Sequence, residues 1–156
     1  MTAVLTWLET TGLAMWIRES PSLLAYPMIL TLHTFGLGLL AGAATVVNLR
    51  LLGVARRLPV APLRSLFKVM WIGFWLNAVT GSLLFIADAT VRGTSALFMA
   101  KLLFVALGVA TIVLIKRAVF DAPGGPAVSA QGKRLALLSL VAWTVAITFG
   151  RLLAYV

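Results

Sequence analysis

Four long runs of apolar residues, separated by short polar stretches, dominate the hydrophobic pattern of this chain. The runs cover residues 23–47, 66–87, 95–115 and 135–156, and each has about the 20 residues that a helix needs to cross a bilayer. Short connections place consecutive helices side by side and antiparallel. The pattern therefore predicts an all-α fold, in which residues 21–156 form an up-down bundle of four transmembrane helices.

The chain before these runs follows a different pattern and forms a separate segment, residues 1–20. A candidate helix over 3–18 is too short and too polar to span a membrane, and its tryptophans and charged residues suit the membrane interface. The segment lacks the basic start of a signal peptide. We expect a short amphipathic helix at the interface, followed by a new helix with Ser20 as its N-cap and Pro21 in its first turn.

The composition is that of a membrane protein. Hydrophobic residues make up 62% of the chain and charged residues 11%, whereas a soluble domain has about 25% charged residues. The net charge of +9 does not indicate nucleic-acid binding, because the basic residues gather at the ends of the apolar runs, where membrane topology requires them. Cysteine is absent, which excludes disulfides and thiolate metal sites.

Lysine and arginine also predict the orientation in the membrane. The connections after the first and third apolar runs are rich in these residues, whereas the connection after the second run holds Arg92 alone. Basic connections stay in the cytoplasm. We therefore expect a multi-pass membrane protein with both termini outside.

The only histidine of the chain, His33, lies near the middle of the first apolar run. An ionisable side chain at that depth is costly and usually faces the bundle interior or a cavity. Three interpretations stay open: a hydrogen bond to a neighbouring helix, an axial bond to the iron of haem b, or proton transfer. Gly36 follows one turn later and leaves space beside the ring. His33 is therefore the main candidate for binding a cofactor or metal.

A haem is commonly held by two side chains, and this chain offers no second histidine. The second iron ligand would have to be methionine, water or His33 of another subunit. Three methionines are available for this role: Met28, Met70 and Met99.

Three charged side chains are expected in the outer half of the bundle. Asp88 ends the second run, Lys101 lies in the third, and Arg151 lies near the end of the fourth. One interpretation is structural: the long cationic side chains reach the interface, and Asp88 pairs with Lys101. The other is an anion site above His33, in which Lys101 and Arg151 hold haem propionates or a carboxylate ligand.

Small and polar residues predict close helix packing in the first two runs. Gly38 and Gly42 form a G-x-x-x-G pair, which lets membrane helices approach closely and favours self-association. In the second run, Asn77, Gly81 and Asp88 lie on one face. We expect this stripe to join helices through polar contacts.

Two strings resemble the motifs of a known family: Leu32-His33-Thr34-Phe35-Gly36 and Leu49-Arg50-Leu51-Leu52-Gly53. They are similar to the L-H-x-x-G and L-R-L-L-G motifs of a family of small bacterial inner-membrane proteins with four spans and no known function. The resemblance implies a location in the bacterial inner membrane but no activity. The chain departs from the pattern at Asn48, where an acidic residue is expected. Its likeness to cytochrome b-like bundles is a more distant analogy.

Three functions fit these features. The leading hypothesis is a small membrane protein that binds haem b or takes part in redox chemistry, with His33 as the ligand. The alternatives are a scaffold or accessory subunit of a larger membrane complex, and a homo-oligomeric channel or carrier for a small anion. The sequence shows no nucleophile–base pair and no phosphate loop, so an independent hydrolase is not expected.

Overall fold

The chain folds into helices: the computed structural model describes residues 2–155 and has no strand in that range. The α-helices are α1 (Thr2–Glu9), α2 (Gly12–Glu19), α3 (Tyr26–Leu52), α4 (Leu66–Ile86), α5 (Ala89–Thr94), α6 (Ala96–Ile115) and α7 (Ala130–Leu152). A 3₁₀-helix, η1 (Ala61–Ser65), precedes α4, and a π-helix, η2 (Lys116–Phe120), extends α6.

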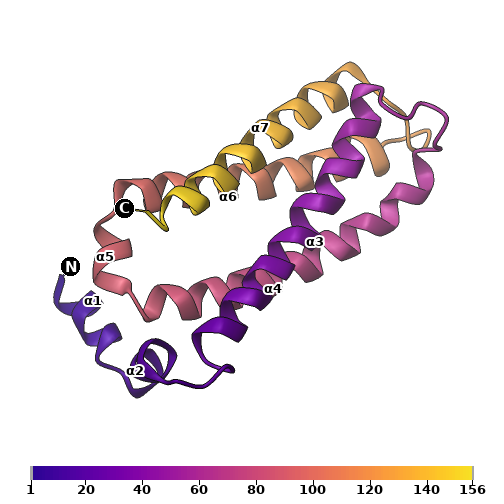
Figure 1. The fold of residues 1–156 in the computed structure, drawn as a ribbon. Coiled ribbons are helices and arrows are strands. Elements are labelled where there is room, and N and C mark those ends of the chain that lie inside the picture. Colours follow the sequence, from indigo (N-terminus) through magenta and orange to yellow (C-terminus); the bar gives the residue numbers. More distant parts are fainter. Residues whose placement is uncertain (1, 156) are drawn as a thin grey trace.

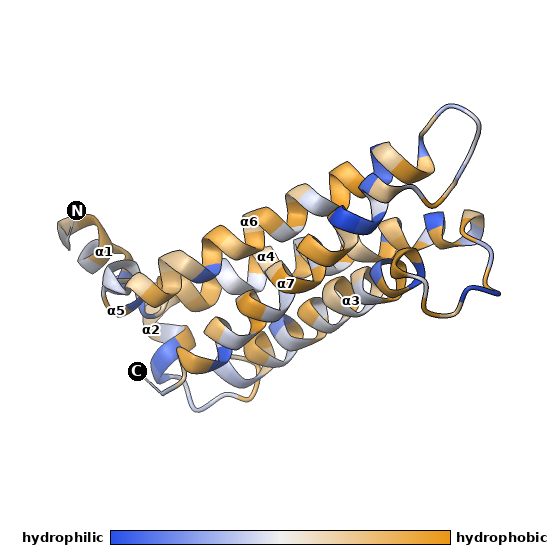
Figure 2. Ribbon diagram, turned by 90° about the horizontal axis from the view of Figure 1, so that it is seen from above, coloured by the Kyte–Doolittle hydropathy of each residue, from blue (hydrophilic) through white to orange (hydrophobic). Residues whose placement is uncertain are grey.

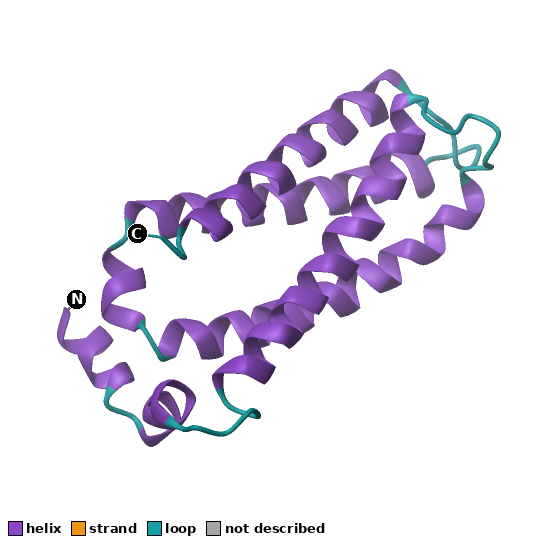
Figure 3. Cartoon of the chain, viewed as in Figure 1, coloured by secondary structure: helices purple, strands orange, loops and turns teal. Residues whose placement is uncertain are grey.

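Four helices are long and apolar enough to cross a membrane: α3, α4 with η1, α6 with η2, and α7. They run up and down in chain order, and both termini lie at the same end of the bundle (Figures 1 and 3). We call this the terminal end. The opposite end holds residues 53–65 and 121–129, and we call it the loop end. Hydrophilic residues concentrate toward the two ends (Figure 2). The predicted all-α fold is confirmed: four helices that are long and apolar enough to span a membrane follow a short helical segment at the N-terminus.

The buried core of the bundle lies toward the loop end. The rings of Phe67 and Phe120 meet edge to face, with centroids 5.0 Å apart. An ion pair of 2.6 Å between Arg64 and Asp121 joins the two loops of this end. The larger buried apolar side chains come from α3, η1-α4, α6-η2 and α7: Leu40, Val47, Leu51, Phe67, Met70, Ile112, Ile115, Val119, Phe120 and Trp143.

The start of α3 corrects the prediction for Ser20 and Pro21. Ser20 is the C-cap that follows α2, and α3 begins only at Tyr26. Pro27 takes the first-turn position, where a residue without an N–H loses no hydrogen bond. The first membrane helix is therefore shifted along the chain from the predicted one.

The fourth membrane helix also differs in its bounds. Ser129 Oγ accepts a hydrogen bond from the Gly132 N–H at 3.0 Å, and this cap starts α7 at Ala130, before the predicted start at residue 135. The helix ends at Leu152, and Val156 lies outside the described residues. The polar stretch between the second and third apolar runs contains the short helix α5.

The N-terminal segment forms two short helices where one was predicted. Thr11 Oγ1 accepts a hydrogen bond from the Ala14 N–H at 3.3 Å and so caps α2. The capping geometry requires extended backbone at Thr11, which interrupts the helix between α1 and α2. Met1 lies outside the described residues.

These two helices pack against the terminal end of the bundle (Figure 1). Ile17 of α2 is fully buried in a small cluster with Ile29 and Ala87. On α1, Glu9 Oε1 accepts hydrogen bonds from the Thr90 N–H and hydroxyl of α5, at 2.7 and 2.6 Å. The segment is therefore attached to the bundle by both apolar and polar contacts.

Candidate functional site

His33 and Asn77 hold α3 against α4 through a reciprocal pair of hydrogen bonds. Nδ1 of the His33 ring lies 3.1 Å from the Asn77 backbone carbonyl, and Asn77 Nδ2 donates to the His33 backbone carbonyl at 2.8 Å. Nδ1 also lies 3.1 Å from Thr80 Oγ1. The hydrogen bond from His33 to a neighbouring helix, one of the three interpretations of this residue, is therefore present.

These contacts determine which ring nitrogen carries the proton. A backbone carbonyl can only accept, so Nδ1 of His33 must be the donor. Thr80 Oγ1 donates its own proton to the Leu76 carbonyl at 2.6 Å, which leaves its lone pairs free to accept from Nδ1. In the neutral ring, Nε2 then keeps its lone pair. Within residues 2–155, Nε2 has no hydrogen-bond partner.

Glycines give the ring and the two helices room. A Cβ at Gly81 would lie 3.0 Å from Cε1 of His33, so the ring packs directly on the α4 backbone. A Cβ at Gly36 would lie 2.8 Å from the Asn77 backbone nitrogen, and one at Gly73 would lie 2.7 Å from the Gly36 carbonyl oxygen. Gly36 therefore serves the close approach of α3 to α4.

His33 borders a pocket of about 400 Å³ between α3, α4 and α6. Ligand pockets commonly measure about 300–1,000 Å³ and are mostly apolar with a few polar groups. This pocket follows that pattern, because its polar side chains besides His33 are Asn77, Ser82 and Lys101. The rest of its lining consists of Leu40, Phe74, Ala78, Gly81, Phe85, Phe98, Met99, Leu102 and Val105.

Lys101 of α6 is the cation of this pocket. No acidic side chain of residues 2–155 lies within ion-pair distance of it. Its Nζ lies 6.0 Å from the centroid of the Phe98 ring. Asp88 does not pair with Lys101, as one interpretation expected, but with Arg92 at 3.4 Å. Lys101 therefore brings an unpaired positive charge to the pocket.

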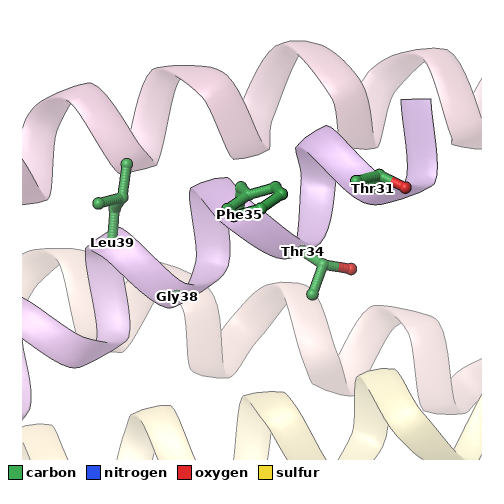
Figure 4. A pocket seen from close by; sticks show the side chains of 5 residues that line it. All are labelled: Thr31, Thr34, Phe35, Gly38 and Leu39. Atoms are coloured by element: carbon green, nitrogen blue, oxygen red, sulfur yellow. The ribbon is translucent and has the colours of Figure 1, made fainter. Parts of the chain in front are cut away.

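Other residues singled out from the sequence lie away from this pocket. Arg151 of α7 is exposed, and its guanidinium lies 5.5 Å from the centroid of the Tyr155 ring, so the structure does not bring it to His33. A Cβ at Gly38 or Gly42 would meet nothing within 4 Å. Figure 4 shows a second hollow, which lies along α3 and is lined by Thr31, Thr34, Phe35, Gly38 and Leu39.

One of the three methionines considered as a second iron ligand shares the pocket with His33. Met99 lies on α6 in the pocket lining. Met70 is buried in the core, and Met28 is exposed on α3 outside the pocket. Of the three methionines that the sequence offered as a second iron ligand, only Met99 therefore lies in the pocket lining with His33.

Sequence reasoning missed the roles of three further residues of the site. Thr80 follows Asn77 by one helical turn, and this spacing could have identified it as a second partner for the ring. Phe85 of α4 and Phe98 of α6 stack with their centroids 5.4 Å apart. No spacing along the chain predicts such a contact between different helices.

Residues 2–155 contain no group of three or more His, Cys, Asp or Glu side chains that could hold a metal ion. A bare transition-metal ion such as zinc needs several protein ligands. Haem iron needs only one or two, because the macrocycle supplies the others. The single imidazole therefore suits a metal held in a macrocycle better than a bare ion.

No family model, curated protein or solved structure matches this chain. The resemblance to four-span inner-membrane proteins therefore stays a prediction. A function has to be inferred from the geometry of the pocket itself.

Proposed function

We propose that this membrane protein binds haem b, with Nε2 of His33 as the ligand to the iron. The observation that supports this most strongly is the anchoring of Nδ1 on the Asn77 carbonyl, which leaves Nε2 with a free lone pair in a residue that borders the pocket. Metal-binding histidines almost always donate their other ring N–H to a carbonyl, a carboxylate or water, and this bond fixes the tautomer and the ring orientation. Asn77 and Thr80 provide that support here.

The rest of the pocket fits a flat, largely apolar group that carries negative charge. Aliphatic and aromatic side chains of α4 and α6 form most of the walls. Lys101, which has no acidic partner in residues 2–155, would hold a propionate. Met99 offers a thioether as a second ligand. Bound haem would supply reversible one-electron transfer.

A carrier for a small anion is the competing use of Lys101. The pocket does not favour it, because mostly apolar walls cannot replace the hydration that a small ion loses on entry. A purely structural role for His33 explains Nδ1 but leaves Nε2 and Lys101 without partners. The haem proposal accounts for both groups.

The placement in the cell and the self-association are further parts of the proposal. We place the loop end in the cytoplasm of a bacterium and both termini outside the inner membrane, because basic residues gather at the loop end. The exposed Gly38 and Gly42 leave one face of α3 available to a helix of a second copy or of a larger complex.

Visible absorption of the purified protein tests the proposal. The protein is made in haem-replete cells and purified with an affinity tag that contains no histidine. The wild type should show a Soret band that shifts on reduction with dithionite, and His33→Gln should lose it. Thr34→Val is the matched control, because among the described residues the Thr34 hydroxyl bonds only to the Leu30 carbonyl of its own helix. Absence of the band in the wild type, or its persistence in His33→Gln, would contradict the proposal.

A further inference from the structure

The helices of the bundle do not pack evenly around the pocket. Extensive close contacts join α3 to α4, α6 to α7 and α3 to α7, but α4 and α6 are not joined in this way. The two helix pairs diverge toward the terminal end, where α5 connects them (Figure 1). The pocket beside His33 occupies this place, with α3 as its floor and α4 and α6 as its walls.

Aromatic contacts bridge the walls toward the terminal end. Phe85 in the last turn of α4 and Phe98 in the first turn of α6 stack with centroids 5.4 Å apart and planes inclined by 16°. Helix α5 follows directly beyond them, and its first residue, Ala89, is fully buried. A molecule that approached from the water at this end would meet these contacts before it reached His33.

The side of the pocket between α4 and α6 is open. Ser82 on α4 lines this side and is exposed, as are Met99 and Leu102 on α6, at 46% and 45% of their full surface. These residues belong to helices long and apolar enough to span the bilayer. We therefore expect their exposed side to face hydrocarbon rather than water.

We propose that this groove opens to the lipid hydrocarbon and that haem b reaches His33 sideways from the bilayer, between α4 and α6. The inference rests on the proposed function and adds the route of entry to it. Haem b is an amphiphile with an apolar ring and anionic carboxylates. The apolar walls accept the ring, and Lys101, one turn from Phe98, meets the need of a carboxylate for a cation inside the membrane.

Spin labelling can test the opening, because the native chain contains no cysteine. Ser82→Cys places a nitroxide in the groove, and within residues 2–155 the Ser82 hydroxyl bonds only to the Ala78 carbonyl of its own helix. Val79→Cys is the matched control on the same helix, at a position that is 58% exposed and does not line the pocket. In lipid vesicles, power saturation with oxygen reports contact with lipid, and saturation with a nickel chelate reports contact with water.

Both labels should be more accessible to oxygen than to the nickel chelate. When the vesicles carry zinc protoporphyrin, the oxygen accessibility of the Ser82→Cys label should fall by about twofold or more, because a bound ring displaces lipid from the groove. The Val79→Cys label should keep its accessibility. Zinc protoporphyrin is chosen because it carries the same carboxylates as haem and no unpaired electron.

Three results would overturn the inference. Greater access of the nickel chelate to the Ser82→Cys label would show a water-filled mouth, and exclusion of both reagents would show a groove covered by protein, such as a second copy. Unchanged oxygen accessibility with zinc protoporphyrin, in a protein that binds haem by absorption, would exclude this route. A protein that binds no haem fails the proposed function instead, and the ligand-free labels still decide whether the groove opens to lipid.

Discussion

At the scale of single residues, His33 combines a structural hydrogen bond with a free lone pair. A buried polar group without a partner costs about 1–3 kcal/mol, so the contacts of Nδ1 with Asn77 and Thr80 explain how this ring is tolerated between two helices. These contacts leave Nε2 without a hydrogen-bond partner within residues 2–155. They also do not account for the unpaired charge of Lys101, which borders the same pocket. A bound group that meets both would remove the cost of leaving them without partners.

Gly81→Ala tests how closely the ring orientation controls binding. The added Cβ would lie 3.0 Å from Cε1 of His33 and push the ring away from its preferred orientation. A cost of about 1 kcal/mol is expected for such a displacement, which raises the Kd for haem roughly fivefold. Titration with haemin measures the Kd, and Gly38→Ala is the control, since its Cβ meets nothing within 4 Å. An unchanged Kd in Gly81→Ala would show that the ring does not bind the iron in this orientation.

Part of this site can be predicted from the sequence, because ionisable residues stand out in an apolar run. The same signal does not show which of these residues share a pocket. His33 and Lys101 are conspicuous because charge and polarity are costly inside a bilayer. Arg151 is conspicuous for the same reason, yet it lies over the Tyr155 ring and away from the pocket. Depth along a helix can be read from the sequence, but the neighbour that a side chain faces depends on how the helices rotate against each other.

At the scale of helices, glycines determine how closely α3 and α4 approach. The contact is made by Gly36 and Gly73, whereas the more conspicuous pair, Gly38 and Gly42, contacts no other helix within residues 2–155. Spacing along one helix identifies a face that could pack closely, but not its partner. Gly73 is not part of a G-x-x-x-G pair in its own run, so nothing in the sequence linked it to Gly36.

Gly73→Ala should destabilise the bundle, and Gly42→Ala should not. A Cβ at Gly73 would lie 2.7 Å from backbone atoms of Gly36 and Leu40, which cannot move without separating the helices. Overpacking of this kind costs about 1–3 kcal/mol. Thermal unfolding in detergent, followed by circular dichroism, should show a lower Tm for Gly73→Ala only. Equal Tm values for the two variants would mean that the close approach of α3 to α4 does not occur.

Glu9 makes the contact between α1 and α5 dependent on pH. The Thr90 hydroxyl and N–H donate to its carboxylate and hold the pKa of Glu9 below its usual value of 4.5. Because this pKa is lowered, the ionised carboxylate stabilises the contact fully above pH 4.5. The stabilisation is lost as the pH falls through the pKa of the folded state. The protection factor for hydrogen exchange in α1, which corrects for the pH dependence of the intrinsic exchange rate, should therefore fall below pH 4.5 in the wild type.

Glu9→Gln is the control for this pH dependence. Without a titratable group, its protection factors in α1 should already be lower at neutral pH and should change little on acidification. Protection factors in α1 of the wild type that are the same on both sides of pH 4.5 would contradict the role of this carboxylate.

At the scale of the whole molecule, the number and order of the membrane helices follow directly from the sequence. A bilayer requires each spanning segment to satisfy its backbone internally, so every long apolar run must be a helix. The unequal packing around the bundle could not be predicted in the same way. Asn77 and Gly81 mark the face of α4 that meets α3, but α6 is apolar on almost all sides, and no polar stripe on it marks the face that turns toward a neighbour.

Reporter fusions test the proposed orientation of the molecule. Alkaline phosphatase is active only outside the inner membrane, so a fusion after Tyr155 should be active and an insertion at Gly124 inactive. The expectation follows from the basic residues at the loop end, which keep that end in the cytoplasm. Green fluorescent protein at the same two positions should give the opposite pattern. Activity of phosphatase at Gly124 would reverse the assigned orientation.

The free lone pair of His33 can be observed directly, because the chain contains one histidine and therefore gives one pair of imidazole nitrogen signals. We would record the nitrogen NMR spectrum of protein labelled with nitrogen-15 histidine, without ligand and with zinc protoporphyrin. With the ring neutral, the account predicts a protonated Nδ1 and an unprotonated Nε2, and only Nε2 should shift strongly when the porphyrin binds. A proton on Nε2, or an Nε2 signal that the porphyrin leaves unchanged, would contradict it.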